Sequence, residues 1–279
     1  MSGPEARAVV LAGQRAGTVN ALAQRFGLSH KALIPVRGEP LITYVARTLA
    51  EHERISEIVI SAEPEAFDPI TEVLRRASIS TAKVSFTPAA GTLPDSVFAA
   101  VGKHAGPILI TTADHALLTA ASIDAMLDAV TGSDVAIGMA NKASVLAAHA
   151  EGQRRFYRFR DDEYSNCNLY AMADRSSLAA AEVFRGGGQF AKNVGRIVEA
   201  FGLLNLVLMR LSVLSLAAAM RRISRRIGRT VTPVIIRDGS QAIDVDNDRT
   251  LGCVEDILAR RAGPSVDELR DEEAISTKR

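Results

Sequence analysis

The chain has 279 residues, which suits one large domain with an insertion, and its 47% hydrophobic residues allow a substantial core. Its 33 basic and 32 acidic side chains nearly cancel, so net charge indicates no nucleic-acid or membrane partner. The two cysteines, Cys167 and Cys253, are far apart and in no CxxC pattern. They signal neither a disulfide framework nor a zinc site, and a reducing cytoplasm is the expected location.

Apolar runs alternate with amphipathic segments along most of the chain, a pattern typical of βαβ units around a mostly parallel sheet. In the first half we expect strands at 7–12, 55–61, 82–86, 107–111 and 134–140. Helices are expected at 40–53, 65–77, 94–104 and 120–130. The later part is expected to add strands at 154–160, 166–172, 230–237 and 242–245, and helices at 174–184 and 247–261.

These elements predict an α/β fold over residues 1–262, a three-layer α/β/α Rossmann-like arrangement around a mostly parallel sheet. A helical insertion is expected at about 189–228, and the charged segment 263–279 is expected to be a solvated, flexible tail. The apolar stretch 201–220 contains Arg210. Because an arginine inside a bilayer costs roughly 2.5–3.5 kcal/mol, we expect no transmembrane helix there.

The second half of this insertion is expected to form a two-sided helix that ends at Gly228. Its apolar stripe consists of Val213, Leu216, Met220, Ile223 and Ile227. Its opposite face carries Arg221, Arg222, Arg225, Arg226 and Arg229. Packing against the domain is one interpretation. Another is peripheral contact of 212–229 with an anionic membrane, at the inner surface, or a lid over a lipid-like or anionic substrate. Homo-oligomer formation is a third.

A glycine-bearing turn follows the first predicted strand, in the stretch Leu11-Ala12-Gly13-Gln14-Arg15. Such a turn at the carboxyl end of a parallel strand is where open α/β sheets bind phosphate, because backbone N–H groups can point at the anion. The stretch is neither a Walker A loop nor a GxGxxG motif. An ordinary tight turn is therefore the competing interpretation.

Three further segments carry charged residues in positions that suit phosphate chemistry. Lys31 precedes an apolar stretch and can neutralise a triphosphate, or it is a surface lysine. Asp114 follows the predicted strand 107–111, where a carboxylate can hold Mg²⁺, whereas Thr119 is better placed to cap the next helix. In the predicted strand 242–245 and its continuation, alternation places Asp244 and Asp246 on one side, as a second metal ligand or as helix caps.

In this order, these segments resemble the MobA-like nucleotidyltransferase family of the GT-A fold, which includes molybdopterin guanylyltransferase and methylerythritol-phosphate cytidylyltransferase. The resemblance covers about residues 7–140 and 230–260. It is carried by Leu11-Ala12-Gly13, Lys31-Ala32-Leu33, Gly38-Glu39-Pro40-Leu41, Asp114 and the late aspartates. It implies magnesium-dependent transfer of a nucleoside monophosphate from an NTP to a phosphorylated acceptor, such as a sugar, polyol or lipid-headgroup phosphate, with release of pyrophosphate.

The resemblance also assigns roles to single residues. Nucleotide binding falls to Leu11, Ala12, Gly13, Gln14, Lys31, Ser96 and Thr112. Lys31 and Arg15 would stabilise the leaving pyrophosphate, while Asp114 with Asp246 or Asp244 would hold Mg²⁺. Asp95-Ser96-Val97 is similar to a segment that lies near the base in cytidylyltransferases, which favours CTP, and Asn168 stands where the family has an acceptor-side asparagine.

Gln14 departs from the family pattern, because it replaces a second glycine and its side chain restricts the approach of phosphate. Arg15 or Arg25 would then stand in for the family's loop arginine. Gln14 permits one alternative function, that of a catalytically weakened nucleotide-binding protein. A second alternative is a GT-A glycosyltransferase, because Asp244-Val245-Asp246 matches the DxD motif of that group. Nucleic-acid binding is not expected, because the basic residues cluster on one helix without interleaved aromatics.

Overall fold

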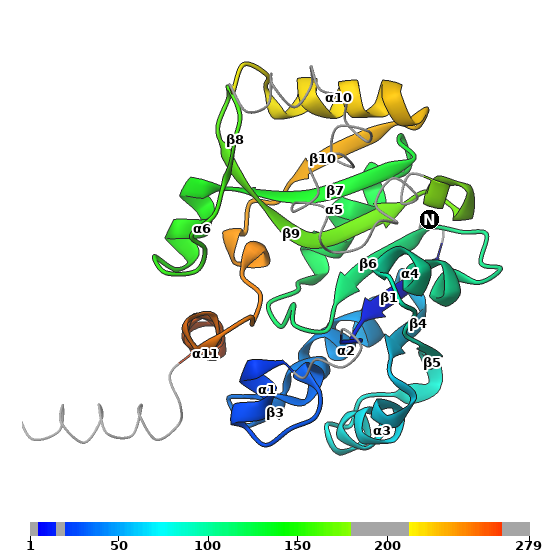
Figure 1. Cartoon of the computed structure of the whole chain (residues 1–279), viewed down its shortest axis with the longest axis vertical. Coiled ribbons are helices and arrows are strands. Elements are labelled where there is room, and N and C mark those ends of the chain that lie inside the picture. The colour runs from blue at the N-terminus through cyan, green and yellow to red at the C-terminus, as the bar shows by residue number, and fades with distance from the viewer. Residues whose placement is uncertain (1–4, 15–19, 180–211, 264–279) are drawn as a thin grey trace, which may run out of the picture.

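The computed structural model describes residues 5–14, 20–179 and 212–263, and a mixed β-sheet lies at the centre of this part of the chain (Figure 1). The sheet has eight strands, with the order β10-β7-β9-β6-β1-β4-β5 and with β8 paired to β9. The strands are β1 (Ala6–Leu11), β4 (Ile55–Ala62), β5 (Val84–Pro88), β6 (Ile108–Thr112), β7 (Val135–Asn141), β8 (Tyr157–Arg158), β9 (Glu163–Met172) and β10 (Val231–Ile235). A small antiparallel hairpin, β2 (Pro35–Val36) and β3 (Glu39–Pro40), lies outside the sheet.

Strand β9 breaks the parallel pattern. It lies between β6 and β7 and runs antiparallel to both, while β10–β7, β6–β1, β1–β4 and β4–β5 are parallel pairs. The start of β9 therefore lies at the same edge of the sheet as the carboxyl ends of β6 and β7, where Asn141 pairs with Tyr164.

Helices cover both faces of the sheet, which gives three layers. Side chains alternate along β1, so that Ala8 and Val10 join one apolar cluster and Val9 joins the other. The first cluster packs against α2 (Leu41–Glu51), α3 (Phe67–Arg76), α5 (Ala120–Ala129) and α11 (Asp248–Ala262). The second packs against α4 (Leu93–Val101) and α10 (Leu216–Ile227). The predicted α/β, mostly parallel Rossmann-like class is confirmed.

Short elements connect these layers, and several were not predicted. They are the helices α1 (Ala21–Arg25) and α6 (Lys142–Ala148) and the 3₁₀ turns η1 (Lys31–Leu33), η2 (Pro64–Ala66), η3 (Thr81–Lys83), η4 (Arg175–Leu178) and η6 (Gly239–Ala242). Two helix starts are set by capping boxes, Thr119 with Ser122 for α5 and Asn247 with Thr250 for α11. Thus Asp114, Asp244 and Asp246 are not needed as caps.

Helix α10 packs against the body of the protein. It begins after the capping residue Ser215 and ends at Gly228, whose backbone is left-handed as the sequence predicts. Leu216 and Met220 are buried, and Ile223 and Ile227 pack against the second cluster beside β10, whereas Val213 precedes the helix and is 48% exposed. This arrangement matches the packing interpretation, because the apolar face is already covered. No helix within the described ranges combines the length and apolarity needed to cross a bilayer.

Three predicted elements differ in the structure. The expected strand 242–245 is extended chain without a β-ladder, because η6 occupies 239–242 and the chain then passes directly to the Asn247 cap of α11. The expected strand 154–160 is reduced to β8, and the expected helix 174–184 begins as the 3₁₀ turn η4. The end of the predicted helix 174–184, the first part of the predicted insertion (189–211) and residues 264–279 of the predicted tail lie outside the described residues.

Candidate active site

Four segments that are distant in sequence meet at the carboxyl edge of the parallel strands, which is where open α/β sheets bind their ligands. They are the loop after β1, the turn η1, the loop after β6 and the extended stretch 243–247. The last two are joined directly, because the backbone N–H of Val245 donates to the carbonyl of Asp114 at 3.3 Å. This bond brings Asp114 beside both late aspartates.

Lys31 lies between two of the carboxylates. Its ammonium donates to Asp114 Oδ2 and, at 2.8 Å, to Asp246 Oδ1. The side chains of Lys31 and Asp114 are only 20% and 15% exposed, while that of Asp246 is 66% exposed. Burial alone would lower the pKa of Lys31, but the charges of Asp114 and Asp246 outweigh it and raise that pKa. The cation is therefore firmly held in its charged form.

Asp244 is the third acid of the cluster. Its Oδ2 accepts a hydrogen bond of 2.6 Å from Asn168 Nδ2. Burial, followed by the charges of Asp114 and Asp246, raises its pKa well above the ordinary value. Asp244 and Asp246 do not share a strand face as predicted, because a tight turn, closed by the Asp246 N–H on the Asp244 carbonyl at 3.1 Å, aims them differently.

Two buried oxygens in this cluster suit a divalent cation. Asp114 Oδ1 and Asp244 Oδ1 have no hydrogen-bond partner, which is a costly state for buried carboxylate oxygens. Mg²⁺ is commonly held by one or two carboxylates, with waters and substrate phosphates as its other ligands. Within the described ranges, no ready-made cage of three or more His, Cys, Asp or Glu side chains was found. The donor set therefore fits a magnesium ion that shares its ligands with a nucleotide.

Asn168 reaches Asp244 because of an irregularity in β9. Between the paired residues Ile137–Tyr170 and Met139–Asn166, β9 contains more residues than β7, so the strand bulges. Asn168 has a left-handed backbone with φ of 48°, and its N–H donates to Asn166 Oδ1 at 3.1 Å. The bulge thus turns Asn168 out of the ladder and toward the aspartates, where it supports a predicted metal ligand.

The loop after β1 is tightly packed. A Cβ on Gly13 would lie 2.7 Å from the Cβ of Ala89, so glycine is required for this close approach. Ser96 acts indirectly on the same place, because its hydroxyl accepts a 2.8 Å bond from the Ala90 N–H and so fixes the segment beside Gly13. Thr112 Oγ1, at the end of β6, is buried without a partner.

Gln14 is bonded through both its backbone and its side chain. Its N–H donates to Glu63 Oε1 at 2.6 Å, and its side-chain amide donates to the Ser29 carbonyl at 2.7 Å. The side-chain oxygen of Gln14 accepts from the Asn20 N–H at 3.1 Å. A carboxylate therefore already occupies one loop amide of the kind that would bind phosphate.

Sequence reasoning missed Glu63, which directly follows β4 at the same edge of the sheet. The rule that selected Asp114, a carboxylate just past a buried parallel strand, applies equally to Glu63. Nε2 of the buried His30 lies 3.7 Å from Glu63 Oε2, the carboxylate oxygen that does not bind Gln14. Arg15 lies outside the described residues, and Arg25 forms an exposed ion pair with Asp248.

Comparisons with known proteins identify a family and a shared fold. The family model of the MobA-like NTP transferase domain matches residues 8–200. A hypothetical transferase from Thermus thermophilus is 25% identical, covers 88% of this chain and 99% of its own, and superposes with a TM-score of 0.72. No curated protein matched the chain.

Two more distant structures share the fold. One is 4-diphosphocytidyl-2C-methyl-D-erythritol synthase from Anaerococcus prevotii, with 10% identity, a TM-score of 0.57 and coverage of 91% of this chain and 96% of that one. The other is CMP:2-keto-3-deoxy-manno-octonic acid synthetase complexed with CTP, with 14% identity, a TM-score of 0.55 and coverage of 92% and 99%. At these identities the likeness concerns the fold alone.

Proposed function

Because the chain belongs to the MobA-like NTP transferase family, we propose that it moves a nucleoside monophosphate from an NTP to a phosphorylated acceptor and releases pyrophosphate. The observation that carries the proposal is the convergence of Asp114, Asp244 and Asp246 around Lys31, with two buried carboxylate oxygens left unpaired. Such a cluster has the charge and the open coordination that a metal-bound triphosphate requires.

The chemistry needs little proton transfer. A phosphate monoester has a second pKa of about 6, so the acceptor is mostly ionised at pH 7 and needs no strong general base. The protein's task is to position the acceptor oxygen in line with the α-phosphorus and to neutralise developing charge. Magnesium on Asp114 and on Asp244 or Asp246 would neutralise charge on the nucleotide phosphates. With those carboxylates neutralised, the Lys31 ammonium is available to the phosphates of the leaving pyrophosphate.

The identities of the donor and the acceptor are proposed from the sequence. CTP is the proposed donor, on the similarity of Asp95-Ser96-Val97 to cytidylyltransferases, and the acceptor is a sugar, polyol or lipid-headgroup phosphate. Asn168 is proposed to act on the acceptor side through Asp244, which it contacts. We do not propose membrane contact through α10, since the apolar side chains of this helix pack against the second cluster. They are Leu216, Met220, Ile223 and Ile227.

The test is a screen for pyrophosphate release, with four NTPs against a panel of phosphorylated alcohols and sugars, each with Mg²⁺ and with EDTA. We expect one pair to give metal-dependent release. Asp114→Asn should reduce that release by at least about 100-fold. Asp128→Asn is the matched control, since Asp128 lies near the carboxyl end of α5, is 71% exposed and pairs with Arg54. Equal loss in both variants, or full activity of Asp114→Asn, would reject the assignment.

The bonds of Gln14 favour a second candidate function, nucleotide binding without transfer. Glu63 on the Gln14 amide and the fixed Gln14 side chain restrict the place where a phosphate would sit. Calorimetry would then show tight NTP binding, while the same screen shows no pyrophosphate with any acceptor. Parallel incubation with NDP-sugars tests the glycosyltransferase alternative.

A further inference from the structure

The two acidic segments of the site repel one another, yet they are held together. Asp114 lies in the loop between β6 and α5, while Asp244 and Asp246 follow η6. Near the carboxylates, the backbone bond from Val245 to Asp114 joins the two segments at 3.3 Å. The like charges of the carboxylates on the two segments repel one another and so destabilise the contact. Further bonds between the segments are therefore needed to keep the acids close when no cation is present.

Gln241 supplies one such bond from the interior. Its side chain is fully buried, donates from Nε2 to the Leu117 carbonyl at 2.5 Å, and accepts from Ser122 Oγ at 2.9 Å. Gln241 precedes Asp244 by three residues and Leu117 follows Asp114 by three. The Gln241 amide thus joins the two acidic segments at points that each lie three residues from an aspartate of the cluster.

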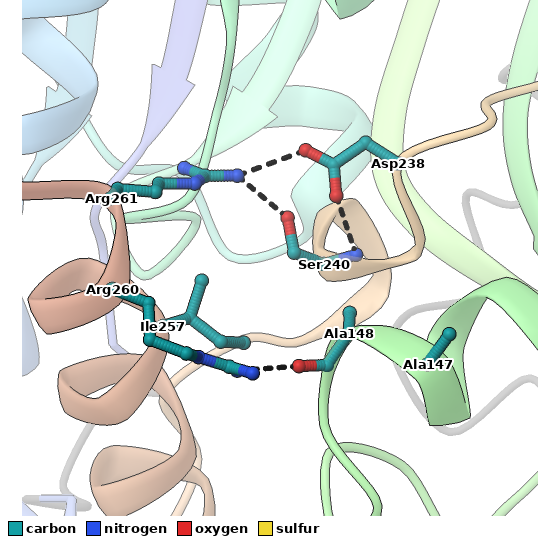
Figure 2. A pocket seen from close by; sticks show the side chains of 7 residues that line it. All are labelled: Ala147, Ala148, Asp238, Ser240, Ile257, Arg260 and Arg261. Carbon is teal, nitrogen blue, oxygen red and sulfur yellow. Dashed lines mark hydrogen bonds and ion pairs between the residues drawn. The ribbon is translucent and has the colours of Figure 1, made fainter. Parts of the chain in front are cut away.

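Arg261, in the last turn of α11, supplies a second tie from outside. Its Nη1 donates to the same Leu117 carbonyl at 3.1 Å. Its Nη2 donates to Ser240 Oγ at 2.7 Å and to Asp238 Oδ2 at 2.9 Å, so one guanidinium bonds to both segments. Figure 2 shows Arg261 reaching across to Asp238 and Ser240, at one side of an open pocket.

The turn η6 is itself anchored on its other side. A Cβ on Gly239 would lie 2.1 Å from the carbonyl carbon of Ser144, so the turn is pressed against the backbone of α6. Because η6 is fixed against α6, the bonds of Gln241 and Arg261 to the Leu117 carbonyl hold the loop of Asp114 in place beside η6.

We propose that Gln241 and Arg261 are positioning residues that hold Asp114 against Asp244 and Asp246, and so set the affinity of the cluster for a divalent cation. The inference rests on the proposed function for the identity of the cation, but cation binding is measurable without any turnover. Groups that orient metal ligands typically change metal affinity by 10–100-fold when removed. The two residues share the Leu117 carbonyl, so each partly covers the loss of the other.

The test uses Gln241→Leu, Arg261→Met and the double variant. In each single variant the Leu117 carbonyl keeps one donor, and Ser122 Oγ keeps its bond to the Thr119 carbonyl, so both proteins should fold. Arg260→Met is the matched control. Its guanidinium donates to the Ala148 carbonyl at 2.6 Å, on the opposite side of the pocket in Figure 2, and bonds to neither acidic segment.

Mn²⁺ dissociation constants are measured by electron paramagnetic resonance in the absence of nucleotide, on proteins whose thermal melts are also recorded. We expect each single variant to bind Mn²⁺ about tenfold more weakly. In the double variant the loss should exceed the product of the single losses. Arg260→Met should match the wild type. Where turnover is found, saturating Mg²⁺ should restore most of the rate, which a general loss of folded protein would not allow.

Unchanged Mn²⁺ affinity in the double variant, equal weakening in Arg260→Met, or a wild type that binds no Mn²⁺ would each overturn the inference. Weakened Mn²⁺ binding in the Gln241 and Arg261 variants supports the inference even when no acceptor yields pyrophosphate. In that case the proposed transfer reaction fails while the positioning role stands.

Discussion

Replacing Lys31 by methionine removes a cation that contacts both Asp114 and Asp246. Breaking a fully buried ion pair by removing one partner costs about 3–5 kcal/mol. Lys31 and Asp114 retain 20% and 15% exposure and Asp246 is 66% exposed, so solvent screening reduces the expected cost to about 2 kcal/mol. For a chain of this size, 1 kcal/mol shifts the melting temperature by about 2–4 °C. At pH 8 in EDTA, Lys31→Met should therefore melt about 4–8 °C below the wild type.

Magnesium should reverse most of that loss. A divalent cation between the aspartates supplies the positive charge that the lysine supplied, and a ligand at 100 times its dissociation constant stabilises the folded state by about 2.7 kcal/mol. Differential scanning fluorimetry in EDTA and in Mg²⁺ measures both effects. Lys142→Met is the control, because Lys142 pairs with Glu163 at 2.6 Å rather than with any of the three aspartates, and is 42% exposed. Its effect should stay within about 1 kcal/mol and not respond to Mg²⁺.

Two results would refute this reasoning. One is a Lys31→Met protein that melts with the wild type in EDTA, which would mean that the ion pairs contribute nothing. The other is a loss of equal size with and without Mg²⁺, which would mean that no cation takes the place of the ammonium.

Three further predictions concern stability. Burial and the neighbouring carboxylates raise the pKa of Asp244, so in EDTA the folded state holds this proton more tightly than the unfolded state does. The stabilisation that results is lost as pH rises above about 4. Asp244→Asn should therefore raise the urea midpoint at pH 8 but not at pH 4. Gly13→Val should cost about 1–3 kcal/mol by urea unfolding, because its Cβ would meet Ala89, and Ala89→Gly in the same chain should recover part of it. Met220→Ala should cost about 2–4 kcal/mol because Met220 is buried, while exposed Arg221→Ala should stay within about 0.5 kcal/mol; equal effects would contradict the packing of α10.

The parts of the fold that were predictable are those with strong local patterns. β1, β4 and β6 each contain an apolar run, at 8–11, 58–60 and 108–110, and their carboxyl ends indicated where charged side chains would gather. Asp114 was identified in this way, while Lys31 and the late aspartates were singled out by their charge and position, and the resemblance assigned their roles. The structure brings these four residues together, as expected for a shared site.

The unpredictable parts depend on contacts between distant segments. Nothing local distinguishes β9 from a parallel strand, because an apolar run has no direction of its own. The stretch around Asp244 alternates like a strand, yet η6 and the close contact of Gly239 with Ser144 leave no neighbouring ladder for it to join. Gln241 gave no signal at all, since a single glutamine acquires a role only through the carbonyl that it meets.

The reversed direction of β9 has a practical consequence for labelling the protein. The strand begins at the edge that holds the aspartates and ends with Met172 opposite Ile108, at the start of β6 and the far edge of the sheet. The exposed residue Ser176 follows in η4, and both native cysteines are buried. A fluorophore attached through Ser176→Cys would therefore sit across the full length of the strands from the aspartates, where it can report the binding of a fluorescently labelled nucleotide by energy transfer without obstructing the site.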